Sequence, residues 1–303
     1  MHGSLLPDWA HQYLLEDERF AAAYARVGLQ DKTRLKKCIA ALHAWYGQSR
    51  QFEQTTGSDF FQGLQTWTMR KPRDWALVRV EPHLDSPAVL LATLLPPVLA
   101  GVREVVICSP RDRLPYPDAQ LTAFELGGMD NVLNCPEHIE QELLREMYAR
   151  SKSGMIISVY AEPPAGGSGS AHLDFAGLVP AYTLCAPQTA GLWIDDPGEW
   201  NFEALDFAQP SLRTTLWSAG GISPPPSRPL RRGTMKEFRQ AGYDLLFVAP
   251  RHLRTTLGWA PVILGPGQES AWVWPEFCRS MCQTTRLVWH DPNPEDEPFP
   301  EPA

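Results

Sequence analysis

The sequence contains no long uninterrupted apolar run, which argues against a membrane-spanning helix. Such a helix needs about 18 consecutive uncharged, mostly apolar residues. The longest apolar stretch, 86–102, is broken by Pro87, Pro96 and Pro97. The N-terminus has neither the basic start nor the continuous apolar stretch of a signal peptide. We therefore expect a cytoplasmic protein without membrane contact.

A strongly basic surface is also missing. Lysine and arginine number 27 against 35 acidic residues, which gives a formal net charge of −8. The densest basic stretches, 34–37 and 228–232, carry three cations each, as a solvated surface commonly does. We expect no nucleic-acid partner, because such partners require an extended positive face.

Closely spaced cysteines are rare. The six cysteines are scattered along the chain, and only Cys278 and Cys282 lie within a few residues of each other. This spacing suits either a pair of metal ligands or one face of a helix, and no second Cys/His pair accompanies it. A zinc site is not supported by the cysteines.

Apolar periodicity is present near the N-terminus. Residues 8–27 and 31–47 have the pattern of helices, and the second has one apolar face built on three- and four-residue steps. That face is expected to pack against another domain or against a second subunit, and the second alternative would make the protein a homodimer. We assign residues 1–70 to an N-terminal helical segment.

From residue 71 onward the pattern changes to short β-branched strands alternating with helices. This alternation is typical of parallel βαβ units, and it predicts an α/β fold with a Rossmann-like parallel sheet over 71–160. The expected strands are 75–80, 103–108, 131–135 and 155–160, and the expected helices are 87–100, 118–126 and 136–150.

The second half has weaker signals and is predicted to be a reduced α/β part over 161–290. Two loops rich in glycine, proline and serine, 161–171 and 223–233, flank its first strands. The acidic and proline-rich tail, 291–303, is expected to be disordered. The expected strands are 191–195, 214–218, 244–250, 261–265 and 286–290, with a helix near 275–283.

One segment resembles a known family. Residues 87–110 are similar, without a gap, to a helix–strand segment of histidinol dehydrogenases, and 123–134 resembles the helix–turn–strand that follows it. Residues 35–48 look like the helix that precedes the first domain of that family. The equivalent positions in 87–110 are Pro87, Leu91, Thr93, Pro96, Ala100, Gly101, Val102, Glu104 and Pro110.

The resemblance implies an aldehyde-dehydrogenase-like fold and a metal-dependent, NAD-linked oxidation of an amino alcohol. Most of the family's functional motifs have no match here. A Gly-Gly turn is expected at 79–85, where this chain has none, and a histidine among the zinc ligands is missing from 191–217. The resemblance therefore leaves NAD open as a cofactor and does not support zinc.

A cofactor site and a catalytic pair can still be placed by position. Ligands of parallel sheets sit beyond the carboxyl ends of the strands, so Ser109 and the loop glycines Gly166 and Gly167 are candidate cofactor contacts. The family's catalytic Glu-His pair corresponds to Arg251 and His252. Arginine stays protonated, so it cannot act as the base that activates water.

Three hypotheses follow from these departures. The first-ranked one is a histidinol-dehydrogenase-like protein that has lost the zinc- and NAD-dependent oxidation and binds a small molecule or a partner. The second is an active NAD-dependent oxidoreductase of the same type. The third is another enzyme that uses Arg251, His252 and Glu269 around a small acidic ligand.

Overall fold

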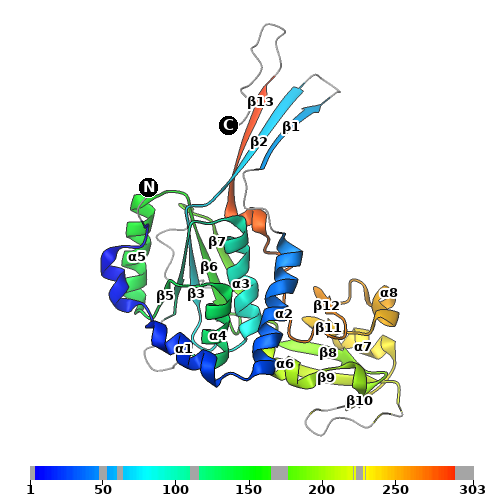
Figure 1. Ribbon diagram of the computed structural model, residues 1–303. Helices are drawn as coiled ribbons and strands as arrows, with labels where there is room; N and C mark the ends of the chain where they lie inside the picture. Colours follow the sequence, from blue (N-terminus) through cyan, green and yellow to red (C-terminus); the bar gives the residue numbers. More distant parts are fainter. Residues whose placement is uncertain are drawn as a thin grey trace.

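The computed structural model describes residues 4–47, 53–59, 64–109, 116–164, 177–220, 222, 228 and 230–290. Within these residues the chain is an α/β protein with three sheets (Figure 1). Two five-stranded parallel sheets and their helices form the body, and a three-stranded antiparallel sheet projects from it. The predicted α/β class is confirmed.

The first sheet has the strand order β5-β4-β3-β6-β7 and is covered on both faces. Side chains alternate along β3: Trp75 packs with the helix α5 on one face, and Ala76 packs with the helix α3 on the other. The elements are β3 (Trp75–Val80), α3 (Pro87–Ala100), β4 (Glu104–Cys108), α4 (Asp118–Gly127), β5 (Val132–Leu133), α5 (Glu137–Arg150), β6 (Gly154–Tyr160) and β7 (Ala181–Cys185).

The helix α3 is the most deeply buried element of the body. It begins after Ser86, whose hydroxyl accepts a hydrogen bond from the Val89 N–H, and Pro87 occupies the first turn, where a missing N–H costs nothing. It ends at Gly101, which adopts a left-handed conformation with φ 84°. The strand, helix and strand predicted for 75–108 are confirmed within one residue.

The N-terminal helices cover the first sheet. The apolar face of α2 packs against α3 through Leu35, Cys38 and Leu42, so this face is buried within the chain itself. The helix η1 packs with α5 on the opposite side of the sheet. These elements are η1 (Asp8–Tyr13), α1 (Asp17–Arg26) and α2 (Leu29–Tyr46).

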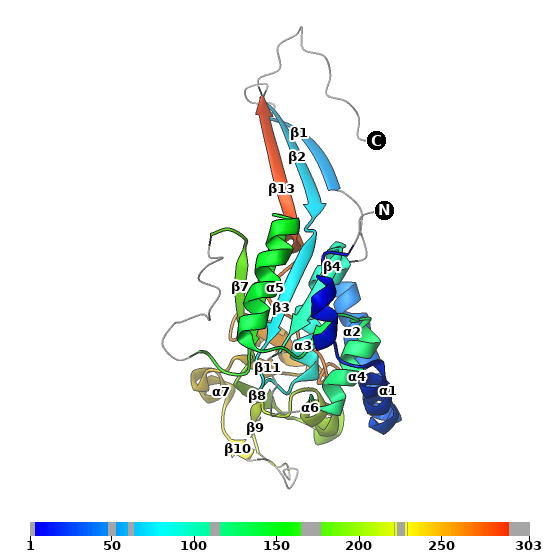
Figure 2. The same cartoon turned by 90° about the vertical axis from the view of Figure 1, so that its left-hand side faces the viewer.

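The second sheet has the order β10-β9-β8-β11-β12. It lies beside the first sheet, and α6 and α7 pack near it (Figures 1 and 2). Its elements are β8 (Thr189–Trp193), η4 (Pro197–Glu199), α6 (Phe202–Ala208), β9 (Arg213–Ser218), β10 (Leu230–Arg232), α7 (Met235–Ala241), β11 (Leu245–Phe247), η5 (Pro250–His252), α8 (Leu253–Thr256) and β12 (Val262–Leu264).

The third sheet, here called the arm, consists of β1 (Glu53–Asp59), β2 (Leu64–Pro72) and β13 (Gln283–His290). Its central strand β2 pairs antiparallel with both neighbours and continues into β3 (Figure 2). A short turn, η6 (Arg279–Cys282), leads from the body into β13.

The structure differs from the predicted division of the chain in three places. Residues 53–59 and 64–72 are strands although the whole of 1–70 was assigned to helices, and β7 joins the first sheet although it lies beyond residue 160. The helix expected near 275–283 is only the four-residue turn η6. The strands β2 and β13 pair with each other although they are far apart in the chain, which local periodicity does not predict. The tail 291–303 lies outside the described residues.

No helix within the described ranges is long and apolar enough to cross a membrane.

Candidate functional site

A cavity of about 640 Å³ lies at the carboxyl edge of the first sheet, where β3, β6 and β7 end. The loop from α6 to β9 closes it from the side of the second sheet. We call it the acidic pocket, because three carboxylates and one guanidinium line it. Its charged and polar lining includes Glu81, His83, Asp85, Tyr160, Glu162, Gln188, Gln209, Ser211 and Arg213.

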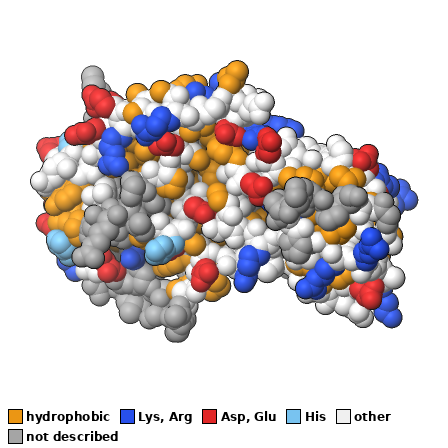
Figure 3. All heavy atoms as spheres, turned by 90° about the horizontal axis from the view of Figure 1, so that it is seen from below, with side chains coloured by type: hydrophobic (Ala, Val, Ile, Leu, Met, Phe, Trp, Pro, Cys, Tyr) orange, Lys and Arg blue, Asp and Glu red, His pale blue; other side chains and the backbone are white. Residues whose placement is uncertain are grey.

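The position of the acidic pocket follows from the topology. Parallel strands bring their carboxyl ends to one edge, and the loops that follow them meet there. The floor is apolar and comes from Leu84, Val89 and Leu212. Figure 3 views the molecule from this end, and acidic side chains lie along the middle of that face, between the two lobes.

Two of the carboxylates are held by the backbone and by the second sheet. The carboxylate of Glu81 accepts hydrogen bonds from the backbone N–H groups of His83 at 3.1 Å and Ala161 at 3.2 Å, which ties the end of β3 to the end of β6. The Asp85 carboxylate accepts a hydrogen bond from the Ser211 hydroxyl at 2.6 Å. Glu162 follows β6 and is exposed.

The described residues of the acidic pocket do not fit the pyrophosphate of a dinucleotide. A helix N-terminus binds phosphate through free N–H groups and a close backbone approach. Here Pro87 has no N–H, the Val89 N–H is bonded to the Ser86 hydroxyl, and the Leu90 N–H is bonded to the Ser86 carbonyl. Asp85 adds a negative charge directly before this turn.

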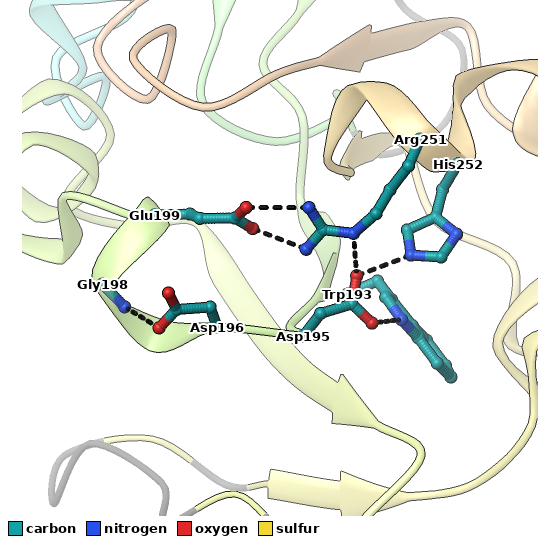
Figure 4. A network of polar contacts seen from close by, with 7 residues as sticks. All are labelled: Trp193, Asp195, Asp196, Gly198, Glu199, Arg251 and His252. Atoms are coloured by element: carbon teal, nitrogen blue, oxygen red, sulfur yellow. Dashed lines mark hydrogen bonds and ion pairs between the residues drawn. The ribbon is translucent and has the colours of Figure 1, made fainter.

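A second group of charged side chains lies at the carboxyl edge of the second sheet (Figure 4). The Arg251 guanidinium donates hydrogen bonds to both carboxylate oxygens of Glu199 at 2.8 Å and to Asp195 at 2.7 Å. The Asp195 carboxylate also contacts His252 Nε2 at 2.6 Å and accepts a hydrogen bond from Trp193 Nε1 at 3.0 Å. These five residues are called the Arg251 network.

Charge and hydrogen bonding set the protonation states in the Arg251 network. Burial by itself raises the pKa of Asp195, but hydrogen bonds from His252, Arg251 and Trp193 outweigh it and hold that pKa below its usual range. Hydrogen bonds to Glu199 and Asp195 raise the pKa of Arg251. Arg251 is therefore a fixed cation that orients two carboxylates, and it cannot serve as a base.

The Arg251 network and the acidic pocket lie at opposite edges of the second sheet. Gln188 of the pocket precedes β8 and Arg213 is the first residue of β9, whereas Asp195 and Arg251 follow β8 and β11. A five-residue strand such as β8 spans about 16 Å at 3.3 Å per residue. Chemistry at His252 therefore has no direct access to a ligand in the acidic pocket.

Of the predicted cofactor contacts, the structure describes only Ser109. Ser109 directly follows β4 and is fully buried, and its N–H donates a hydrogen bond to the Leu133 carbonyl at 3.2 Å. It does not line the acidic pocket. Gly166 and Gly167 lie outside the described residues. Among the residues that the structure describes, no cluster of three or more His, Cys, Asp or Glu side chains has a metal-binding arrangement.

Sequence analysis missed Glu81 and Asp85 as pocket residues. The segment 79–85 was noted only for its missing glycines. Two carboxylates within the loop that follows a buried strand are a usable signal, since that loop in a parallel sheet lies at the ligand-binding edge.

No protein-family model and no curated protein sequence matches this chain. Solved structures match it over most of its length. The histidinol dehydrogenase of Elizabethkingia anophelis has 12% identity and a TM-score of 0.54, covering 91% of this chain and 76% of its own.

Two further structures agree with this result. A 3,6-anhydro-L-galactose dehydrogenase has 10% identity and a TM-score of 0.53, with 90% of this chain and 84% of its own covered. An oxidoreductase from Marinobacter aquaeolei has 10% identity and a TM-score of 0.54, with the same two coverages. The chain has the fold of the aldehyde and histidinol dehydrogenases, and at these identities the likeness concerns the fold alone.

Proposed function

We propose that this protein binds a small, positively charged molecule in the acidic pocket and does not carry out the NAD-dependent oxidation that its fold suggests. The observation that carries the proposal is the lining itself: Glu81, Asp85 and Glu162 face one guanidinium, that of Arg213. Carboxylates grouped around an apolar floor stabilise a cationic ligand, and a volume of about 640 Å³ suits a small molecule.

The same lining argues against a dinucleotide. A pyrophosphate would approach Asp85 and a helix start whose N–H groups are largely taken by Ser86. Like charges at short distance raise the free energy of the bound state. Arg251 also argues against the NAD-dependent oxidation, because its side chain stays protonated and cannot act as the base.

Calorimetry with two cationic probes, putrescine and L-histidinol, tests the proposal. Binding of either probe is expected, and Glu162→Gln is expected to raise its Kd up to about fivefold, since an exposed ionic contact contributes up to about 1 kcal/mol. Glu142→Gln, an exposed residue of α5 outside the pocket, is the matched control and is expected to leave the Kd unchanged. Failure of both probes to bind would contradict the proposal.

An activity assay tests the second part of the proposal, that the protein does not carry out NAD-dependent oxidation. The protein is incubated with NAD, L-histidinol and Zn²⁺ or Mn²⁺, and the absorbance of the reduced cofactor is followed. No turnover is expected. Turnover that His252→Ala abolishes would instead establish an active dehydrogenase.

A further inference from the structure

A second cavity of about 640 Å³ lies at the amino edge of the first sheet, at the base of the arm. It is separate from the acidic pocket, which lies at the other end of the same strands. We call it the basic pocket. Its charged lining consists of Lys71, Arg73, Asp74, Lys152 and Arg286.

The pairing register of the arm builds one wall. Lys71 of β2 is opposite Thr284 of β13, and Met69 is opposite Arg286. Directly opposed residues of an antiparallel pair share a face, and so do residues two apart on one strand. This register therefore brings Lys71 and Arg286 to the same face of the arm, and all four residues line the cavity.

The loop between α5 and β6 builds the facing wall. The Ser151 hydroxyl donates a hydrogen bond to Asp74 at 2.6 Å, and the Ser153 N–H donates to the Ser151 hydroxyl at 3.1 Å. Behind them, the buried indole of Trp75 donates to the Ser151 carbonyl at 2.9 Å. The loop is thus fixed before any ligand arrives, which lowers the ordering cost of binding.

The positive charge of the basic pocket is poorly neutralised by its own lining. Four cations face one carboxylate, that of Asp74, which is 3.8 Å from Lys71 and already accepts the Ser151 hydroxyl. Within the described residues, the Arg73 guanidinium donates hydrogen bonds to two neutral acceptors, the carbonyls of Met281 at 3.4 Å and Gly154 at 3.2 Å. Burial lowers the pKa of Arg73, as expected for a cation that has lost water without gaining a full counter-charge.

We propose that the basic pocket binds a compact anion with two or more negative charges, the class that includes pyrophosphate and phosphate monoesters. Two guanidinium groups and two ammonium groups around one cavity suit phosphate oxygens, which accept paired hydrogen bonds from arginine. This site is independent of the function proposed for the acidic pocket, and it is unusual for a chain with a net charge of −8.

The test is titration calorimetry of the full chain with inorganic pyrophosphate at constant ionic strength. Saturable binding is expected. Arg286→Gln is expected to raise the Kd about tenfold, since it removes a charge-assisted hydrogen bond to the anion. Both Lys71→Gln and Lys152→Gln are expected to weaken binding by smaller factors, because a lysine binds phosphate as a single point charge.

Two controls distinguish specific binding in the basic pocket from nonspecific electrostatic attraction of the anion. Arg232→Gln, an exposed cation of β10 on the second sheet, is expected to leave the Kd unchanged. Circular dichroism of Arg286→Gln must match that of the parent. Absence of saturable pyrophosphate binding, or equal affinities of parent and Arg286→Gln, would overturn the proposal.

Discussion

The two edges of the first sheet carry pockets of about the same volume and opposite charge. At the carboxyl edge three carboxylates face one guanidinium, and at the amino edge four cations face one carboxylate. The carboxyl-edge pocket is built from loops that follow the strands of the sheet. The amino-edge pocket needs the arm, whose paired strands β2 and β13 lie far apart in the chain.

This difference shows that the parallel sheet by itself does not determine which class of ligand each edge can bind. The parallel sheet supplies two places where loops converge, and the charges on those loops decide what each place can stabilise. The acidic pocket has Glu81 and Asp85 in the segment where the resemblance implies a Gly-Gly turn, while positive charge lies at the other end of the same strands.

Gly154→Ala, at the amino edge of the first sheet, is expected to reduce the stability of the protein more than any other substitution proposed below. An added Cβ would stand 1.9 Å from the indole of Trp75, which is fully buried and cannot move aside. We expect the free energy of unfolding to fall by about 3 kcal/mol or more in urea titrations, in line with severe overpacking. Pyrophosphate binding should weaken too, since Trp75 holds the Ser151 carbonyl.

Gly127→Ala is the control for that change. Gly127 is the last residue of α4, and the nearest atom to an added Cβ is in Leu91 at 3.5 Å, an ordinary contact. Its effect should stay within about 1 kcal/mol. Equal stability of Gly154→Ala and the parent would show that Trp75 does not set the packing of this edge.

Thr93→Val tests the helix beneath the acidic pocket. The buried hydroxyl of Thr93 accepts a hydrogen bond from Trp274 Nε1 at 3.1 Å and donates to the Val89 carbonyl at 2.9 Å. Valine keeps the shape but leaves the buried indole N–H without its acceptor, so we expect a loss of about 1–3 kcal/mol in unfolding free energy. Thr33→Val, at an exposed threonine of α2 with the same bond to its own helix, should change it by less than about 0.5 kcal/mol.

Asp195→Asn should have the smallest effect and should spare both pockets. The folded state holds the pKa of Asp195 below its usual range, so its ionised form stabilises the protein above about pH 4. That contribution is lost as the pH falls through the lowered pKa. The gap in unfolding free energy between parent and variant should be constant near neutral pH and narrow below about pH 4.

Asp130→Asn, at an exposed position, is the control for this titration and should show a much smaller gap at any pH. Affinities for pyrophosphate and for cationic probes should be unchanged in Asp195→Asn. An altered affinity at either pocket would show that the Arg251 network is coupled to it.

Much of the first sheet could be predicted from local sequence. The strand 75–80 and the helix 87–100 match the structure at both ends, because a β-branched run, a capping serine before Pro87 and a glycine at 101 specify them locally. The arm was missed because β1 and β2 have little apolar alternation, and because β2 pairs with β13, a strand more than 200 residues away.

The candidate sites were harder to predict for a similar reason. His252 and Arg251 were identified through a resemblance, but their partners Asp195 and Glu199 lie more than 50 residues upstream. Lys71 and Arg286 of the basic pocket are unremarkable in the sequence. No local pattern indicates that two such cations share one face.

The sequence by itself determined the α/β class, the order of strands and helices in 75–160 and the absence of a glycine turn after β3. Those features depend on residues that are neighbours in the chain. Only the tertiary structure decided which charges meet, because the carboxyl-edge and amino-edge pockets are each assembled from segments brought together by sheet pairing. Electrostatic interactions depend on the distance between charges in space, and that distance cannot be read from the positions of the residues in the sequence.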